Sequence, residues 1–201
     1  MKSLEDCYNE IDLIIGHFCA TCFSYALAVK DFERIQKEGM QILATQGQKL
    51  TLQQFDQISF SFGQGPPSTP GAYFYYTTTH GGFKERIKKD GIDIKILANN
   101  SLVLIYHIWE DKYREIIARE YGVQKNQIVH DTFGELRNIR RSIVHNKSRA
   151  LKECENNTNL KKFDEGGQIL FSEQEAYYSF KAIKDALDEL KSNLALCPAD
   201  S

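Results

Sequence analysis

Four arginines and one histidine lie within a single segment, residues 134–150 (GELRNIRRSIVHNKSRA). These residues are Arg137, Arg140, Arg141, Arg149 and His145. The guanidinium group pairs with phosphate and carboxylate oxygens, and histidine can accept or donate a proton near neutral pH. The combination predicts a site that binds an anionic substrate and moves a proton on it. A helix face of solvated charges, paired with acids from neighbouring helices, is the alternative.

Residues 136–150 have the apolar spacing of a helix that packs against a core on one side. The residues expected on the core side are Leu136, Ile139, Ile143 and Ala150. Arg137, Arg141 and His145 follow one another at four-residue steps and form a stripe on the opposite side. The residues expected beside this stripe are Asn138, Ser142 and Arg149, with Arg140 and Val144 at the boundary between the two sides. Arginines four residues apart repel each other unless an anion lies between them.

The stretch IRRSIVHN, residues 139–146, resembles the signature of the HEPN superfamily (higher-eukaryote and prokaryote nucleotide-binding helical domains). In that signature an arginine and a polar residue precede a histidine, and the matching positions are Arg140, Arg141 and His145, with Asn146 after them. Arginine at the polar position departs from the usual Asn, Asp or His. The motif spacing favours Arg140 as the motif arginine, whereas the helical wheel favours Arg141 as the neighbour of His145.

A second stretch adds to the resemblance. LVLIYHIWEDKYRE, residues 102–115, is similar to a buried helix of several bacterial branches, with Trp109 and Glu110 in the matching places. The resemblance therefore covers the second half of the chain, and the first half only in its helicity.

The resemblance implies a metal-independent endoribonuclease that needs no cofactor and in which two copies pair to form one RNA-cleaving site. His145 would move a proton, and Arg140 or Arg141 would offset charge on the phosphorane, giving a 2′,3′-cyclic phosphate. The residues expected to contact substrate are Arg137, Asn138, Ser142, Asn146 and Arg149. The implied partners are RNA, a second copy of the chain and an antitoxin or regulatory protein. The implied setting is a cytoplasmic toxin–antitoxin, anti-phage or stress-response system.

Two other functions are consistent with the same residues. A non-catalytic RNA-, nucleotide- or partner-binding module would use the arginines but would not need His145. A helical scaffold could instead bind a protein partner through the aromatic run at residues 73–76, because exposed aromatic side chains often anchor interfaces.

Composition limits these alternatives. A chain of 201 residues with 42% hydrophobic content can bury one sizeable core, which predicts a single domain over residues 1–201. The 25 basic and 27 acidic residues give a net charge of −2, so any attraction for phosphate must be local. We expect no membrane segment, because no unbroken apolar run reaches the ~18 residues that a spanning helix needs. Five cysteines without framework spacing fit reduced thiols in a cytosol.

The predicted elements are mostly helices. Apolar residues recur at helical steps from Leu4 to about Gln46, where Gly16 and Gly39 allow either one helix or two. Residues 47–82 contain three of the four prolines and an aromatic, β-branched run, which predict a loop insertion with one hairpin arm.

Further helices are predicted over residues 81–91, from Asn100 or Ser101 to Gly122, over residues 125–150, and from Ser172, where a capping box with Glu175 is expected. Leu104, Ile108 and Ile116 are expected to mark the apolar face of the second of these helices. The fold class is therefore all-α, an up-and-down bundle of four to five helices with peripheral strands.

The remaining histidines are expected to have structural roles. His17 and His107 lie in apolar helical stretches and are expected in the core. His130 is expected at the start of the basic helix, with Asp131 as the alternative N-cap, and His80 falls within the insertion.

Overall fold

The computed structural model describes residues 2–65 and 68–195, most of which are helical. The sheet content of these described residues is one antiparallel hairpin of β1 (Ser59–Gln64) and β2 (Tyr73–Thr79). The prediction of a helical fold with minor strands is therefore confirmed. The described chain divides into two compact units, which we treat separately. Unit 1 comprises residues 2–21 and 95–195, and unit 2 comprises residues 22–65 and 68–94.

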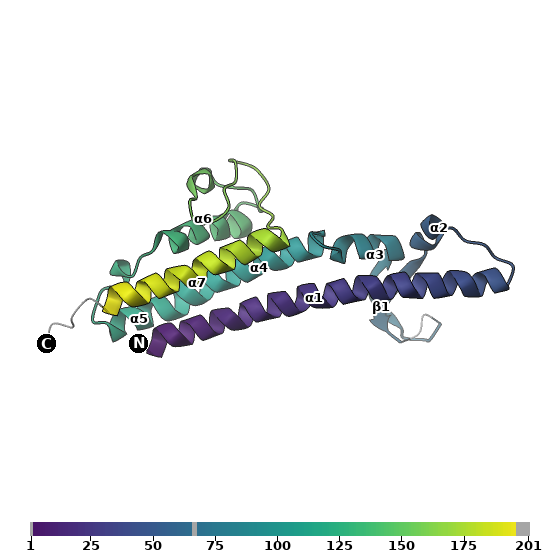
Figure 1. Cartoon of the computed structure of the whole chain (residues 1–201), viewed down its shortest axis with the longest axis horizontal. Helices are drawn as coiled ribbons and strands as arrows, with labels where there is room; N and C mark the ends of the chain where they lie inside the picture. Colours follow the sequence, from purple (N-terminus) through teal and green to yellow (C-terminus); the bar gives the residue numbers. More distant parts are fainter. Residues whose placement is uncertain (1, 66–67, 196–201) are drawn as a thin grey trace. The chain divides into compact units, whose positions relative to one another are not determined.

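Unit 1 is a helical bundle. Its helices are the start of α1 (Lys2–Thr45), α4 (Ile92–His107), α5 (Arg114–Glu120), α6 (Asp131–His145) and α7 (Glu173–Ala195). In Figure 1, α7 runs alongside α4 and the start of α1. The rings of Phe18 in α1 and Phe180 in α7 meet edge to face, with centroids 5.2 Å apart. This aromatic contact joins the first and last helices in the core of the bundle.

Shorter segments connect these helices. A π-helical segment, η1 (Ile108–Tyr113), joins α4 to α5, and 3-10 turns form η2 (Lys125–Gln127) and η3 (Lys152–Asn156). In η1 the hydrogen bonds reach five residues along the chain instead of four, a pattern that often occurs at functional sites.

Two predictions for the α4–α5 region are wrong. The helix begins at Ile92, so Asn100 and Ser101 lie inside it and cap nothing. The predicted apolar face is also wrong in part, because Leu104 and Ile116 are 46% and 45% exposed, whereas Ile108 is buried as predicted. The core-facing residues also include Ile105, Trp109, Tyr113 and Ile117.

Several helix ends agree with their sequence signals. The hydroxyl of Ser172 accepts the N–H of Glu175 at 3.3 Å, and the Glu175 carboxylate accepts the N–H of Ser172 at 2.8 Å, so the predicted capping box is confirmed. Gly122 follows the end of α5 with φ of 66°, a conformation that glycine adopts at little cost. His130 caps α6, since its Nδ1 accepts the N–H of Thr132 at 3.2 Å.

The first helix, α1, is continuous, so Gly16 and Gly39 do not interrupt it. In unit 1 it buries Leu4, Cys7, Ile11 and Phe18. One window of α1, with mean hydropathy 1.5, is long and apolar enough to cross a membrane by length and composition alone, and 22% of it is buried. Core helices and N-terminal signal sequences share these properties. The expected cytoplasmic location without a membrane segment therefore stays a prediction.

Unit 2 contains the rest of α1, the hairpin, α2 (Leu52–Asp56) and α3 (His80–Ile87). The predicted hairpin arm is confirmed: Ser59 pairs with Thr79, and the register shifts by a bulge after Phe62. The insertion also contains α2, which sequence patterning did not predict. Pro66 and Pro67 of the predicted loop lie outside the described residues.

His80 lies in an aromatic cluster of unit 2. Its ring centroid is 5.7 Å from that of Phe32, 5.3 Å from Phe55 and 5.0 Å from Phe60. The His80 Nδ1 atom is buried and has no hydrogen-bond partner among the described residues. The hairpin and α3 thus pack on a cluster that contains a titratable ring.

The two histidines expected in the core are exposed, so that prediction is wrong. His17 lies on the open side of α1. The His107 side chain is 61% exposed and pairs with Asp111, with 2.6 Å between Nδ1 and the carboxylate oxygen. Each lies in an apolar stretch, but on the part of its helix that the bundle does not cover.

Candidate functional site

Helix α6 positions the predicted site. Its buried side comprises Thr132, Phe133, Leu136, Ile139 and Ser142, and this apolar spacing attaches the helix to the bundle. The helix ends at His145, where the backbone N–H of Asn146 still donates to the carbonyl of Ser142. Lys147 and Ser148 follow with φ of 53° and 58°, a left-handed turn that stops the helix.

The predicted stripe is present on the open side of α6. Arg137, Arg141 and His145 are all exposed and follow one another at four-residue steps, about 6 Å apart along the helix axis. No described residue forms a hydrogen bond or ion pair with the side chain of Arg137 or of His145. Arg141 contacts Glu153 at 3.4 Å, with the two side chains 46% and 51% exposed. An ion pair as open as this contributes little to stability and leaves Arg141 able to change partner.

Arg140 points away from His145. Five residues along an α-helix correspond to a rotation of about 140°, and the Arg140 guanidinium lies over the ring of Tyr106 in α4, 5.9 Å from its centroid. The neighbour of His145 on the exposed side is therefore Arg141. Within one chain, the two candidates for the motif arginine therefore differ in position: Arg141 lies on the side of His145, and Arg140 lies over the ring of Tyr106.

The prediction that Ser142 lies beside the stripe is wrong. Ser142 is fully buried, with 0% exposure. Its hydroxyl donates to the carbonyl of Asn138 at 2.8 Å and accepts the N–H of Leu151 at 3.0 Å. Ser142 therefore fastens the strand-like segment after α6 to the helix, and it cannot contact a substrate in this conformation.

The other predicted substrate-contact residues divide into two groups. Asn138 is half-buried, and together with Arg137 it lines a cleft beside α6. Asn146 and Arg149 lie past the end of the helix, where the Asn146 side-chain amide donates to the Arg149 carbonyl at 2.9 Å and Arg149 donates to the Gly166 carbonyl at 3.0 Å. Asn146 and Arg149 thus stabilise the turn that follows His145.

The cleft beside α6 has a volume of about 630 Å³. The stacked rings of Trp109 and Phe133, with centroids 4.0 Å apart, join the two helices that form its walls. Residues around its rim include Tyr106, Arg114, Gly134, Asn157 and Thr158. Sequence reasoning did not identify these residues, although a glycine inside a helical pattern costs stability relative to alanine and can indicate a functional reason.

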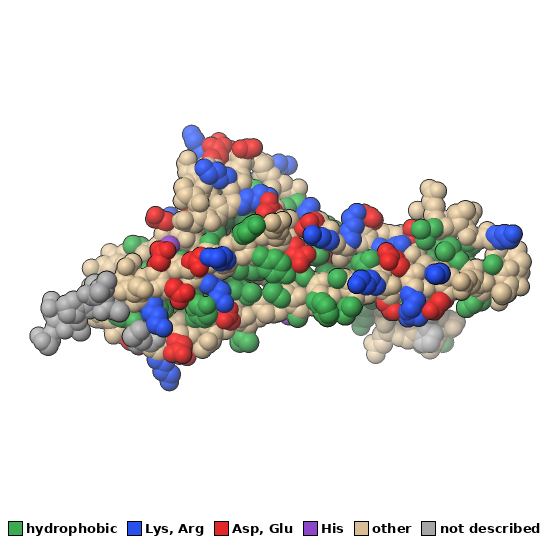
Figure 2. All heavy atoms as spheres, in the orientation of Figure 1, with side chains coloured by type: hydrophobic (Ala, Val, Ile, Leu, Met, Phe, Trp, Pro, Cys, Tyr) green, Lys and Arg blue, Asp and Glu red, His purple; other side chains and the backbone are tan. Residues whose placement is uncertain are grey.

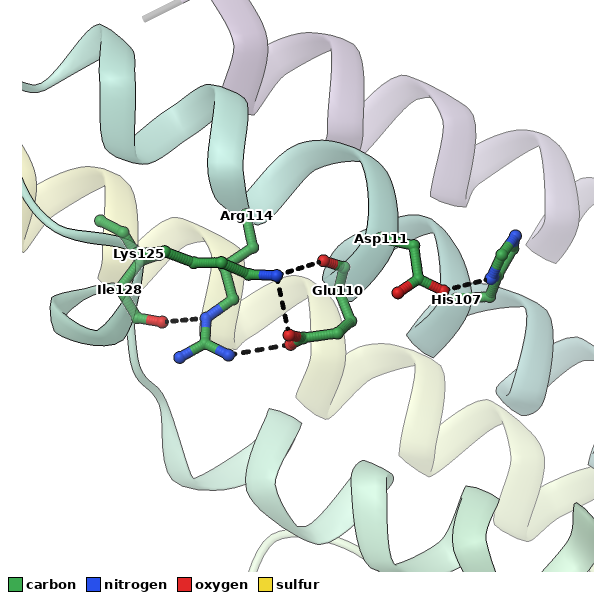
Figure 3. A network of polar contacts seen from close by, with 6 residues as sticks. All are labelled: His107, Glu110, Asp111, Arg114, Lys125 and Ile128. Carbon is green, nitrogen blue, oxygen red and sulfur yellow. Dashed lines mark hydrogen bonds and ion pairs between the residues drawn. The ribbon is translucent and has the colours of Figure 1, made fainter.

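Figure 3 shows a charge network around Glu110, and three of its members, Glu110, Arg114 and Ile128, line the cleft. Glu110, in the π-helical segment, forms ion pairs with Arg114 at 2.8 Å and with Lys125 at 3.0 Å. Arg114 also donates to the carbonyl of Ile128 at 2.7 Å. Burial raises the pKa of Glu110, but the hydrogen bonds from Lys125 and Arg114 outweigh burial, so the net pKa lies below its ordinary value. The two ion pairs thus fix the Glu110 carboxylate in place. Through Lys125 they connect η1 with the segment that leads into α6.

The phenol of Tyr106 lies among charged groups from three elements. Burial raises its pKa above the ordinary value, and Glu110 acts in the same direction. Arg137, Arg114 and Arg140 act in the opposite direction. Arg140 lies over this ring, and Arg114 and Arg137 line the same cleft as Tyr106. Charged side chains of unit 1 therefore form a local group around Tyr106. Over the visible face in Figure 2, acidic and basic side chains are intermixed.

Comparison of the chain with protein-family models, with curated protein sequences and with solved structures finds no match. The functional argument therefore depends on the residues of α6 and the cleft beside it.

Proposed function

We propose that the exposed stripe of α6 binds RNA and cleaves it without a metal ion. The observation that carries the proposal is the alignment of Arg137, Arg141 and His145 on one open side of the helix. Arg137 and Arg140 have no acidic partner among the described residues, so both are available to an external anion. The resemblance of residues 139–146 to the HEPN signature supports the same function.

The chemistry needs one proton acceptor and one charge-stabilising group. His145 accepts the proton of a ribose 2′-hydroxyl as its oxygen attacks the adjacent phosphorus. The guanidinium of Arg141 stabilises the charge that develops on the non-bridging oxygens of the phosphorane. The bond from phosphorus to the 5′-oxygen then breaks, and that oxygen takes a proton from a second imidazolium. The products are a 2′,3′-cyclic phosphate and a 5′-hydroxyl.

A homodimer supplies the second imidazolium. Two copies that face each other through α6 bring two histidines and two sets of arginines together, which concentrates positive charge for RNA on a chain whose net charge is −2. In this arrangement Arg140, which matches the motif spacing, is available to the strand that enters from the Tyr106 side. The proposed setting, a cytoplasmic toxin–antitoxin or defence system with a protein inhibitor, follows from the resemblance alone.

Cleavage of labelled total RNA in the presence of EDTA tests the proposal. We expect wild type to produce fragments with 2′,3′-cyclic phosphate ends and His145→Ala to lose about 10²- to 10⁴-fold in rate, the usual contribution of a positioned acid–base group. Arg141→Ala should also be slow. Arg119→Ala is the matched control, because Arg119 is an exposed arginine of α5 that pairs with Glu115 and should leave the rate unchanged.

Equal cleavage by wild type and His145→Ala would refute the assignment of the chemistry to α6. A second function, RNA binding without cleavage, would use Arg137 and Arg140, which have no acidic partner among the described residues, and would not need His145. Its signature is RNA retention that depends on Arg137 and Arg140 but not on His145, with no fragments from any variant.

A further inference from the structure

The hairpin of unit 2 has two free edges. β1 and β2 form a two-stranded antiparallel sheet, and no third strand among the described residues pairs with either of them. In an antiparallel pair, every second residue of each strand directs its N–H and C=O groups away from the other strand. These outward groups of β1 and β2 are therefore open to a further strand.

The two edges lack most of the features that keep other sheet edges from pairing. Natural edge strands often carry charged side chains or proline. Residues 57–83 contain no Lys, Arg, Asp or Glu, although these types make up 26% of the chain, and neither strand contains proline. One protective feature is present, because the register shift after Phe62 leaves Tyr75 as an extra residue in β2. This bulge bends the strand but adds no charge to its edge.

The hairpin also exposes a cluster of aromatic side chains. Tyr73 and Tyr75 contact each other, with ring centroids 5.0 Å apart, yet they remain 63% and 69% exposed. Phe62, Phe74 and Tyr76 are 39–44% exposed. Because an aromatic side chain offers about 200 Å², these residues leave roughly 500 Å² of aromatic surface uncovered in each chain. Two such surfaces reach the total of about 1,000 Å² at which an interface becomes specific and stable.

The helices of unit 2 cover only one end of this aromatic cluster. In α3, Phe83 lies beside Phe62 with 5.4 Å between ring centroids, and Arg86 lies 5.1 Å from the ring centroid of Tyr76. Among the described residues, Tyr73 and Tyr75 have ring contacts only with each other. The buried apolar residues in the described part of unit 2 are Cys22, Phe55, Ile87 and Ile94. Unit 2 thus leaves most of the aromatic cluster to an outside partner.

A second copy of the chain suits this surface because the surface carries no charge. Identical faces that meet across a two-fold axis bring identical side chains together, so an unpaired charge would repel its own copy. Residues 57–83 contribute no charge. The first two cations that follow are paired within unit 2: Lys84 with Asp56 at 2.9 Å, and Arg86 with Asp93 at 2.7 Å. An anionic partner would find no cation on these strands.

We infer that the β2 strands of two copies pair antiparallel about a two-fold axis and join the two hairpins into one four-stranded sheet. A strand added to a free edge gains backbone hydrogen bonds, and its alternate side chains supply specificity. The aromatic residues of β2 then pack beside their counterparts in the other copy, which stabilises the strand pair. This contact is distinct from the pairing through α6 and does not rest on the proposed function, since it links chains through unit 2 whether or not unit 1 cleaves RNA.

Charge substitutions at Tyr75 test the inference. Tyr75→Lys and Tyr75→Glu each place two like charges at the contact, whereas an equal mixture of the two proteins places opposite charges there. The matched control is Tyr178→Lys in α7, because Tyr178 is a similarly exposed tyrosine of unit 1, at 65%. Association is measured by sedimentation equilibrium over a wide range of protein concentration. Hydrogen exchange of the β2 amides, residues 73–79, is followed over the same range.

Wild type and Tyr178→Lys should associate equally, and exchange of their β2 amides should slow as the concentration rises. Each Tyr75 variant alone should associate at least about tenfold more weakly, because like charges opposite each other destabilise a strand pair. The equal mixture should recover association to within about threefold of wild type. At low concentration the β2 amides of all variants should exchange alike, which shows that the hairpin itself is folded.

The size of the assemblies distinguishes this contact from pairing through α6. Where both contacts form, wild type assembles beyond two chains and Tyr75→Lys stops at two. Where only the hairpin contact forms, wild type stops at two chains and Tyr75→Lys stays at one. A wild type whose β2 amides exchange equally at every concentration would overturn the inference and leave the edge to another protein. Unchanged association of Tyr75→Lys would also overturn it, as would weak association of both variants that the mixture does not restore.

Discussion

Ser142→Ala is expected to destabilise unit 1 without affecting a substrate. The substitution removes the hydroxyl that accepts the N–H of Leu151, and the bonded pair lies inside the protein, with Ser142 fully buried and Leu151 half-buried. An unsatisfied group of this kind costs about 1–3 kcal/mol, and we expect about 2 kcal/mol. For a chain of this size each 1 kcal/mol lowers Tm by roughly 2–4 °C, which gives about 4–8 °C.

Ser192→Ala is the matched control. Ser192 lies on α7, is exposed, and donates its hydroxyl to the carbonyl four residues earlier, Asp188, as Ser142 does to Asn138. The two variants lose the same intrahelical bond, but only Ser142→Ala leaves the Leu151 N–H without a partner. Thermal unfolding is followed by the fluorescence of Trp109, which reports on unit 1. Equal stability of the two variants, or weaker RNA binding by a Ser142→Ala protein of normal stability, would refute the structural role.

Three further outcomes are expected. Burial lowers the pKa of His80 below its ordinary value of 6.5, so the unfolded chain takes up a proton first as the pH falls. Unit 2 should lose stability below about pH 6.5, seen as faster hydrogen exchange in the hairpin after correction for intrinsic rates, and His80→Phe should abolish this pH dependence. Glu135→Ala should speed exchange of the amides of residues 158–160, which its carboxylate accepts, whereas exchange in α7 should not change. Gly134→Ala should raise the stability of unit 1 by up to about 1 kcal/mol, measured by urea unfolding, and a loss of stability would show that the cleft is occupied by the protein itself.

Local signals in the sequence were sufficient for many elements. The capping box of Ser172 and Glu175, the hairpin and the stop at Gly122 each depend on residues within a few positions of one another. The exposure of Arg137, Arg141 and His145 followed from helical spacing, since the opposite side of the same helix is apolar. Such features need no knowledge of the partner surface.

The incorrect predictions concern which sides of a helix are covered by other parts of the folded chain. His17 and His107 lie in apolar stretches, yet the bundle leaves their sides open. Ser142 lies near the polar stripe on a helical wheel, but the segment after α6 folds back and covers it. The cleft also escaped prediction, because Tyr106, Gly134 and Asn157 come together only through tertiary packing.

The π-helical segment η1 determines which side of α5 faces the core of unit 1. The core-facing residues Ile105, Trp109, Tyr113 and Ile117 recur every fourth residue, and along a regular α-helix this spacing would drift by about 120° between the first and the last. The wider winding of η1 takes up that drift, so α4 and α5 face the same core. The orientation of the core side of α5 relative to that of α4 therefore depends on the number of residues between Ile105 and Ile117. Deletion of one of them would turn the core side of α5 by about 100° relative to α4, even if every remaining side chain were kept.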